Sequence, residues 1–166
     1  MQKYNYDILG IGNAVTDIFV EVEDSFLIKN DLVEGTMKLV EESYIKKLLE
    51  GLSLSKTLAG GSVANTLSTV SKLGGSCAFI GSRKNDKYGN LFSYSMEEEN
   101  IFLLNEENIS GQASSICLVL ITPNGERTMC TFLGASTSLN KNNIDLKNFP
   151  NTNIVYLEGY LFDLPD

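Results

Sequence analysis

The sequence predicts an α/β fold in which a parallel sheet is flanked by helices and a small antiparallel sheet stands apart from it. Short apolar runs that end in or before a glycine occur at residues 6–12, 76–81 and 154–158, a pattern typical of buried parallel strands. Segments with apolar residues at helical spacing lie between these runs. Alternating segments around an Asn-Gly pair supply the second set of strands.

Each predicted element has a recognisable start or end. The first strand closes at Gly12, and a polar turn from Asn13 to Asp17 follows it. The helix at 61–73 begins at a glycine pair and ends just before another. In chain order we expect strands at 6–12, 18–23 and 36–40, helices at 41–52 and 61–73, a strand at 76–81, a helix at 86–100, hairpin strands at 115–122 and 127–132, and a strand at 153–158.

Composition narrows the classes of function. The chain has 166 residues, 43% of them hydrophobic and 20% charged, which suits one globular domain. Its net charge of −8 argues against a nucleic-acid binder, and no apolar run reaches the roughly 20 residues of a membrane span. No signal peptide is visible after Met1, and the three cysteines resemble buried, reduced thiols, so we expect a cytoplasmic protein. With no histidine, a Ser-His-Asp triad and most catalytic zinc sites are excluded, and we expect no metal ligands here.

The glycine pair Gly60-Gly61 is the most informative local feature. Neither residue carries a Cβ, so the backbone can approach a ligand closely at the start of a helix whose N–H groups are free. Asn65 lies one turn further along the same helix. The alternative is a tight turn packed under a helix with an exposed amide at Asn65.

Polar residues also follow the ends of the predicted parallel strands, where ligand sites of such sheets lie. Asn13 and Asp17 come after the first strand, and the Asp17 carboxylate could accept hydrogen bonds from two neighbouring hydroxyls. The alternative is that both residues only form the turn. Glu158 ends the last strand at the same edge, but we do not expect it to be a catalytic base.

Four stretches together resemble the N-terminal part of a ribokinase-like (PfkB family) carbohydrate or nucleoside kinase. They cover nearly the whole chain in the order of the family, and the adenosine kinase and ribokinase branches are both similar. The second stretch, which resembles the first family signature, is the most specific. The four are Gly10-Ile11-Gly12-Asn13-Ala14-Val15-Thr16-Asp17, Ala59-Gly60-Gly61-Ser62-Val63-Ala64-Asn65-Thr66, Ile80-Gly81 with Asn85-Asp86-Lys87-Tyr88-Gly89, and Thr122-Pro123-Asn124-Gly125-Glu126-Arg127-Thr128.

The resemblance implies that residues 1–166 are the N-terminal part of one ribokinase-like α/β domain, with antiparallel lid strands inserted at about 18–40 and 115–132. It implies an acceptor site for a small sugar or nucleoside that the lid closes. Arg127 would lie on the lid near the substrate, and the alternative is that it is simply a solvent-exposed arginine on a strand. Cys117, two residues after Ser115, is expected to pack in the core. The implied substrate-binding residues are Asn13, Asp17, Gly60, Gly61, Asn65, Ser115 and Arg127.

The chain departs from the family in one respect. It has no Gly-Ala-Gly-Asp signature, which in the family holds the catalytic base and the anion hole. We therefore expect the base and the main ATP and Mg²⁺ site in a missing C-terminal half, and an inactive fragment here. We expect the chain either to form a homodimer through its lid strands or to contact a separate C-terminal piece of the same protein. The alternative function is a sugar- or nucleoside-binding module without phosphotransfer.

Overall fold

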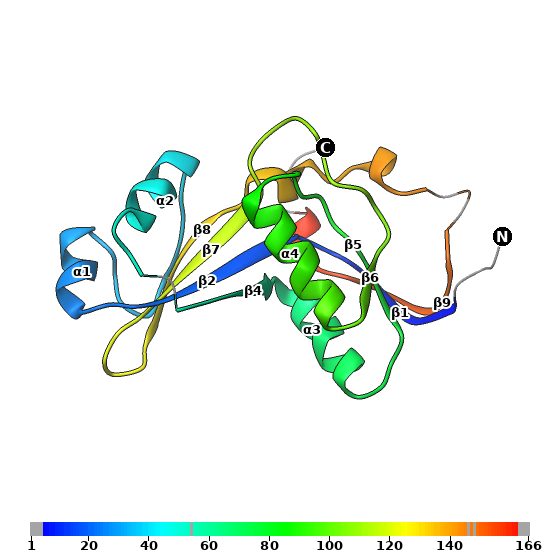
Figure 1. Cartoon of the computed structure of the whole chain (residues 1–166), viewed down its shortest axis with the longest axis horizontal. Helices are drawn as coiled ribbons and strands as arrows, with labels where there is room; N and C mark the ends of the chain where they lie inside the picture. The colour runs from blue at the N-terminus through cyan, green and yellow to red at the C-terminus, as the bar shows by residue number, and fades with distance from the viewer. Residues whose placement is uncertain (1–4, 54, 146, 148, 163–166) are drawn as a thin grey trace.

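The computed structural model describes residues 5–53, 55–145, 147 and 149–162, so the chain ends Met1 and Asp166 lie outside the described residues. It contains a four-stranded sheet of order β6-β5-β1-β9 and a five-stranded sheet of order β3-β8-β7-β2-β4, at opposite ends of an elongated molecule (Figure 1). The strands are β1 (Asn5–Ile11), β2 (Val15–Glu21), β3 (Met37–Leu39), β4 (Lys56–Gly60), β5 (Cys77–Ile80), β6 (Ile101–Leu103), β7 (Ser115–Ile121), β8 (Arg127–Phe132) and β9 (Asn151–Leu157). The helices are α1 (Asp24–Lys29), α2 (Glu42–Leu49), α3 (Ser62–Lys72) and α4 (Lys87–Glu98), with 3₁₀ turns η1 (Gly134–Ser138), η2 (Lys141–Asn143) and η3 (Gly159–Phe162).

The four-stranded sheet is parallel throughout, which confirms the prediction from the three glycine-terminated runs. β1 pairs with β5 and β9, and β5 pairs with β6. Helices α3 and α4 cover one face, where Val63, Leu67 and Phe92 are buried against the sheet. Apolar residues from the segment 139–161 cover the other face over β1 and β5.

Strand β9 is an edge strand with little cover on either face. Among the described strands it pairs only with β1, and the four apolar residues at its C-terminal end are between 36% and 57% exposed. Tyr160 and Phe162 in η3 continue this apolar surface with 66% and 76% exposure. Apolar patches of this kind usually mark a contact surface. The exposed residues of the strand are Ile154, Val155, Tyr156 and Leu157.

The five-stranded sheet, which we call the lid sheet, is mixed, so the prediction of an antiparallel lid is wrong in this detail. β7 pairs antiparallel with β8, and β2 with β4, but β2 runs parallel to β7, and β3 to β8. Alternation of polar and apolar residues shows that a strand is half-buried and says nothing about its direction. The parallel pairs join strands that are far apart in sequence, where no short turn imposes an antiparallel arrangement.

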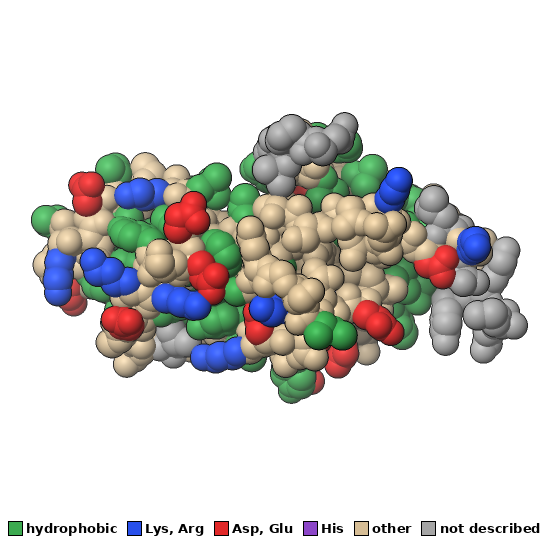
Figure 2. All heavy atoms as spheres, turned by 90° about the horizontal axis from the view of Figure 1, so that it is seen from above, with side chains coloured by type: hydrophobic (Ala, Val, Ile, Leu, Met, Phe, Trp, Pro, Cys, Tyr) green, Lys and Arg blue, Asp and Glu red, His purple; other side chains and the backbone are tan. Residues whose placement is uncertain are grey.

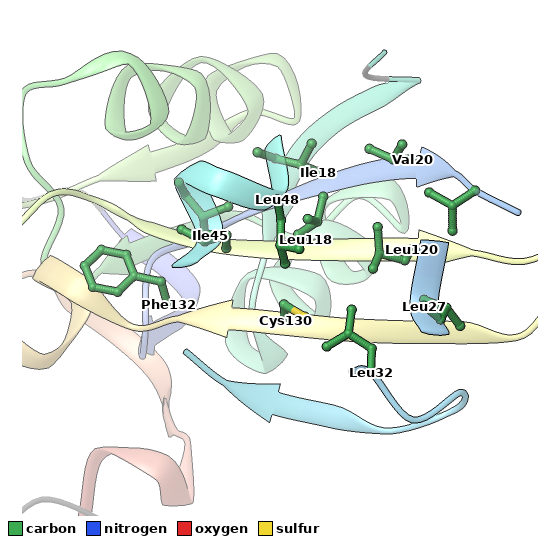
Figure 3. Packing of buried hydrophobic residues seen from close by; sticks show 12 residues of the cluster. Ile18, Val20, Leu27, Leu32, Ile45, Leu48, Leu118, Leu120, Cys130 and Phe132 are labelled. Carbon is green, nitrogen blue, oxygen red and sulfur yellow. The ribbon is translucent and has the colours of Figure 1, made fainter. Parts of the chain in front are cut away.

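The lid sheet has a hydrophobic core of its own, formed on the face that α1 and α2 cover (Figure 3). Ile18 on β2 and Leu118 on β7 point toward Ile45 and Leu48 of α2, and Leu27 of α1 packs at the far end. Each of these side chains is at most 4% exposed. The opposite face, which we call the open face, carries a smaller cluster in which Val15, Cys117 and Val119 are buried among their neighbours on the sheet.

Three elements were not predicted from the sequence. β4 and β6 are short edge strands with few β-branched residues, and they exist because β2 and β5 offer hydrogen-bonding partners. Helix α1 has only six residues, too few for a helical period to stand out. The remaining predicted strands and helices are confirmed, with ends that shift by up to three residues.

On the surface seen from above, charged side chains of both signs intermingle over the lid end, and the middle of the molecule is mostly uncharged (Figure 2). Cys77, Cys117 and Cys130 are free and buried, as expected. Within the described ranges, none of the helices is both long enough and apolar enough to cross a bilayer.

Candidate functional site

The candidate site forms where two chain reversals meet between the sheets. β1 ends at Ile11 and the chain turns through Asn13 into β2, whereas β4 ends at Gly60 and leads directly into α3. β2 and β4 are antiparallel neighbours in which Val15 pairs with Gly60. This pairing brings the two reversals together, and with them four of the residues that the sequence singled out.

Asp17 lies directly over Gly60. A Cβ added at Gly60 would collide with the Asp17 carboxylate, so any other residue at position 60 would force this side chain to move. Within the described part of the chain, no hydrogen bond or ion pair reaches the carboxylate. Burial without a compensating partner raises the Asp17 pKa from 3.8 to about 6. The site thus holds a partly buried acceptor group whose hydrogen-bonding capacity is unused.

Gly61 gives the helix its start. Its φ is +95°, and a Cβ here would lie 2.7 Å from the Asn13 carbonyl oxygen, so both the conformation and the space require glycine. Among the described residues, no side chain caps the N-terminus of α3, which leaves backbone donors of its first turn available next to the site. The carboxylate of Asp17 and these amides are complementary groups that a ligand with several hydroxyls can satisfy.

Glu158, directly after β9, is hydrogen-bonded to both chain reversals. It is 5% exposed, and its carboxylate accepts a hydrogen bond from the Asn13 backbone N–H and another from the Ser62 hydroxyl, both at 2.5 Å. The carboxylate also lies at the positive end of α3. From the sequence, Glu158 was expected at this edge of the sheet, was not expected to be a catalytic base, and was assigned no other role. The one signal for its actual position was a carboxylate at the carboxyl end of a parallel strand, directly before a glycine.

The remaining predicted binding residues lie in different surroundings and do not all face Asp17. Asn65 is exposed on α3, one turn beyond Gly61, and its side chain makes no hydrogen bond to the described residues. Asn13 lines a cavity of about 730 Å³ together with residues 136–142 and Tyr160. Ser115 is fully buried, and its hydroxyl donates to the Phe132 carbonyl oxygen at 2.8 Å.

Arg127 is not close to Asp17. It lies on the same face of the lid sheet, but its register partner on β7 is Ile121, whereas the partner of Asp17 is Cys117. Four residues along a strand correspond to roughly 13 Å. The exposed Arg127 therefore occupies the far end of the lid face, next to the hairpin turn.

The open lid face beside Asp17 is apolar. The register places Phe19, Val119 and Met129 in the next row of side chains along the strands. Cys117 lies beside Asp17, accepts a hydrogen bond from the Thr131 hydroxyl at 3.4 Å, and has its pKa raised to about 11 by burial. The thiol is thus protonated at neutral pH and contributes no charge to the face.

The described residues contain no group of three or more His, Cys, Asp or Glu side chains that could hold a metal ion. The groups that do meet at the site, the Asp17 carboxylate and the backbone N–H groups at the start of α3, suit a polar ligand bound through hydrogen bonds.

Comparison with known proteins gives consistent matches. The profile of the pfkB family carbohydrate kinases matches residues 30–166. Adenosine kinase 2 of Arabidopsis thaliana is 28% identical over 141 residues, which are 80% of this chain and 40% of that protein.

Solved structures agree with this match. The adenosine kinase of Sinorhizobium meliloti has a TM-score of 0.84 and 31% identity, over 96% of this chain and 49% of that one. A probable sugar kinase of Rhizobium etli CFN 42 has a TM-score of 0.84 and 29% identity, over 96% and 48% of the two chains. The chain therefore spans about half the length of these solved relatives.

Proposed function

Because this chain belongs to the pfkB family of carbohydrate kinases, we propose that it forms the acceptor-binding half of an ATP-dependent kinase that phosphorylates a hydroxyl group of a nucleoside. The observation that carries the proposal is Asp17, a partly buried carboxylate that has no hydrogen-bond partner among the described residues and lies over Gly60. Burial already disfavours the charge of this carboxylate, and donors from a ligand would compensate for the lost hydration.

In this proposal two neighbouring hydroxyls of the acceptor donate to Asp17. Backbone N–H groups at Gly61 and the first turn of α3 donate to acceptor oxygens, and Asn65 reaches the same ligand from one turn further on. Asn13 lies at the edge of the site, beside the cavity. Ser115 and Arg127, which the family resemblance also suggests, belong to the lid, and we assign them no direct contact.

A nucleoside is favoured over a free sugar by the lid face. The row of Phe19, Val119 and Met129 next to Asp17 offers an apolar surface, which suits the flat base of a nucleoside. If the ligand instead carried a second sugar ring or a polar chain at this place, its hydroxyls would find no hydrogen-bond partners on this surface. The matches to adenosine kinases support the same choice. A free sugar is the second candidate, supported by the match to a probable sugar kinase.

The family implies ATP with Mg²⁺ as the phosphoryl donor. When bound, that pair supplies the transferred phosphoryl group and neutralises its charge. The half of the kinase formed by this chain then positions the acceptor hydroxyl and excludes water from it. We propose that the catalytic base and the ATP site lie in a second half, which continues the parallel sheet beyond the open edge of β9. We also place the protein in the cytoplasm, in agreement with its free cysteines.

The proposal is tested by measuring ligand binding to the chain by NMR titration with adenosine and with ribose. We expect adenosine to perturb the amides of Asp17, Gly60 and Gly61, and to bind more tightly than ribose. Asp17→Ala should weaken adenosine roughly 10- to 100-fold, the loss expected for hydrogen bonds to a charged group. Unchanged affinity in a folded Asp17→Ala chain would overturn the assignment of the site.

Phosphotransfer distinguishes the half-kinase from a binding module without transfer chemistry. With ATP, Mg²⁺ and adenosine, the chain alone is expected to show no turnover, and addition of the C-terminal half of a relative should restore it. Turnover by the chain alone would contradict the half-kinase proposal. Tight adenosine binding with no restoration by any C-terminal half would favour the binding module.

A further inference from the structure

The segment 85–89, which resembles a family motif, lies outside the acceptor site and has no role in the function proposed above. It precedes and begins α4, on the side of the lid sheet away from the open face. We propose that Asp86 and Tyr88 are positioning residues that clamp the base of the lid sheet to α4 and thereby hold Asp17 over Gly60. The proposal rests on the proposed function only in treating Asp17 as the ligand-binding group.

Asp86 performs two tasks with its two carboxylate oxygens. Oδ1 caps α4 by accepting from the Tyr88 and Gly89 backbone N–H groups at 3.2 and 2.9 Å. Oδ2 accepts from the backbone N–H of Ser114 at 2.9 Å, immediately before β7 begins. These bonds keep the pKa of Asp86 low despite burial, so the carboxylate is charged at neutral pH. One side chain therefore joins the start of a helix to the start of a lid strand.

Tyr88 makes the matching connection to β2. Its backbone carbonyl oxygen accepts a hydrogen bond from the Thr16 hydroxyl at 2.8 Å, and Thr16 is 1% exposed. The Tyr88 ring packs against the core of the lid sheet. A third lid strand is held further along α4, where the Ser95 hydroxyl accepts from the Ala59 N–H at 2.9 Å. Strands β2 and β4, and the residue directly before β7, are thus all hydrogen-bonded to one helix or its cap.

The close packing of this segment shows that the contact is specific. A Cβ at Gly89 would collide with the Lys84 carbonyl oxygen and lie 2.7 Å from the Ser114 hydroxyl. That hydroxyl in turn accepts from the Lys84 N–H at 3.0 Å and lies 3.1 Å from the Lys84 carbonyl oxygen, to which it donates. The loop is therefore closely packed around the Ser114 hydroxyl, which lies just before β7 and bonds to both backbone polar groups of Lys84.

The clamp acts on Asp17 through the strand geometry. Thr16 and Asp17 are consecutive in β2, so their side chains point to opposite faces of the sheet. Thr16 is tethered to α4 on the covered face, while Asp17 lies over Gly60 on the open face. If the tether is lost, β2 can rotate or shift, and the carboxylate moves away from the glycine into water.

The test compares Thr16→Val, which keeps the shape and loses the hydroxyl, with Thr16→Ser, which keeps the hydroxyl. Asp86→Asn retains an oxygen to cap α4 but leaves an NH₂ group opposite the Ser114 N–H. All variants are made in the full chain, and no ligand is needed, so failure of this proposal is distinguishable from failure of the proposed function. The readouts are amide hydrogen exchange and the NMR titration of the Asp17 carboxyl carbon.

We expect the Ser114 amide to exchange about tenfold or more faster in Asp86→Asn, with lid amides affected more than those of β1 and β5. In Thr16→Val the Asp17 pKa should fall toward its ordinary value as water reaches the carboxylate, and Thr16→Ser should restore it. A purely structural role would lower the thermal midpoint and speed exchange throughout the chain, while the Asp17 pKa in the folded state stayed at the wild-type value. That result, or an unprotected Ser114 amide in the wild type, overturns the proposal.

Discussion

Replacing Asp17 with asparagine is expected to stabilise the folded chain at neutral pH while it weakens acceptor binding. Asparagine has nearly the same shape as aspartate, so the approach to Gly60 is preserved. The change removes a charge that burial disfavours, since burial raises the Asp17 pKa from 3.8 to about 6. The group that we propose to bind the ligand is thus a source of instability in the ligand-free protein.

The size of the effect follows from the shift in pKa. A shift of about two units corresponds to an upper bound of about 3 kcal/mol, and solvent screening of a partly exposed group reduces this to about 1–2 kcal/mol. In the folded chain Asp17 keeps its proton up to about pH 6, but in the unfolded chain it loses it near pH 3.8. The free energy of unfolding therefore falls as pH rises between these values, and the loss is complete above about pH 6.

The assay is urea unfolding of wild type and Asp17→Asn at pH 8 and again at pH 3.5. The variant should be more stable than wild type at pH 8, and this advantage should disappear at the lower pH. Asp31→Asn is the control, because it changes the net charge equally at an exposed residue whose positive φ asparagine tolerates. An Asp17→Asn chain that is no more stable than wild type at pH 8, or whose advantage is independent of pH, would refute the reasoning.

Three further outcomes are expected. Gly61→Ala should lower the free energy of unfolding by about 1–3 kcal/mol in urea titrations, because its φ is +95° and the new Cβ meets a carbonyl oxygen of the β1–β2 turn. Arg127→Ala should leave adenosine affinity within about twofold of wild type in calorimetry, since the side chain is roughly 13 Å from the level of Asp17. The wild-type chain should associate through β9 in light scattering, and Val155→Lys should reduce this association; a monodisperse wild-type monomer would contradict it.

The sequence predicted the parallel sheet well because its signals are local. The runs that became β1, β5 and β9 are apolar and lie directly against glycines, and the Pro123-Asn124-Gly125 turn identified the β7–β8 hairpin. The directions within the lid sheet could not be predicted in this way. They depend on which distant strands meet, and β4, with the sequence Lys-Thr-Leu-Ala-Gly, becomes a strand only through its pairing with β2.

The residues of the candidate site likewise fall into those with a local sequence signal and those whose partners are distant in the chain. Asp17, Gly60 and Gly61 were found because they belong to motifs, and the structure brings them together. Glu158 and Asp86 were not assigned their positions because their partners are backbone N–H groups of Asn13 and of residue 114, distant in the chain. The spacing of residues along the sequence cannot predict a hydrogen bond between two segments that become neighbours only in the folded chain.

The separate core of the lid sheet has a consequence for how the protein is made. Its strands come from two stretches, 15–60 and 115–132, with α3, β5, α4 and β6 between them. On a ribosome, β2 and β4 emerge long before β7 and β8, so the apolar residues of the first stretch have no sheet to complete until residue 132 has been added. The parallel sheet can form three of its four strands by residue 103. We therefore expect the lid to be a late-forming unit, and its amides to open and exchange before those of the parallel sheet under native conditions.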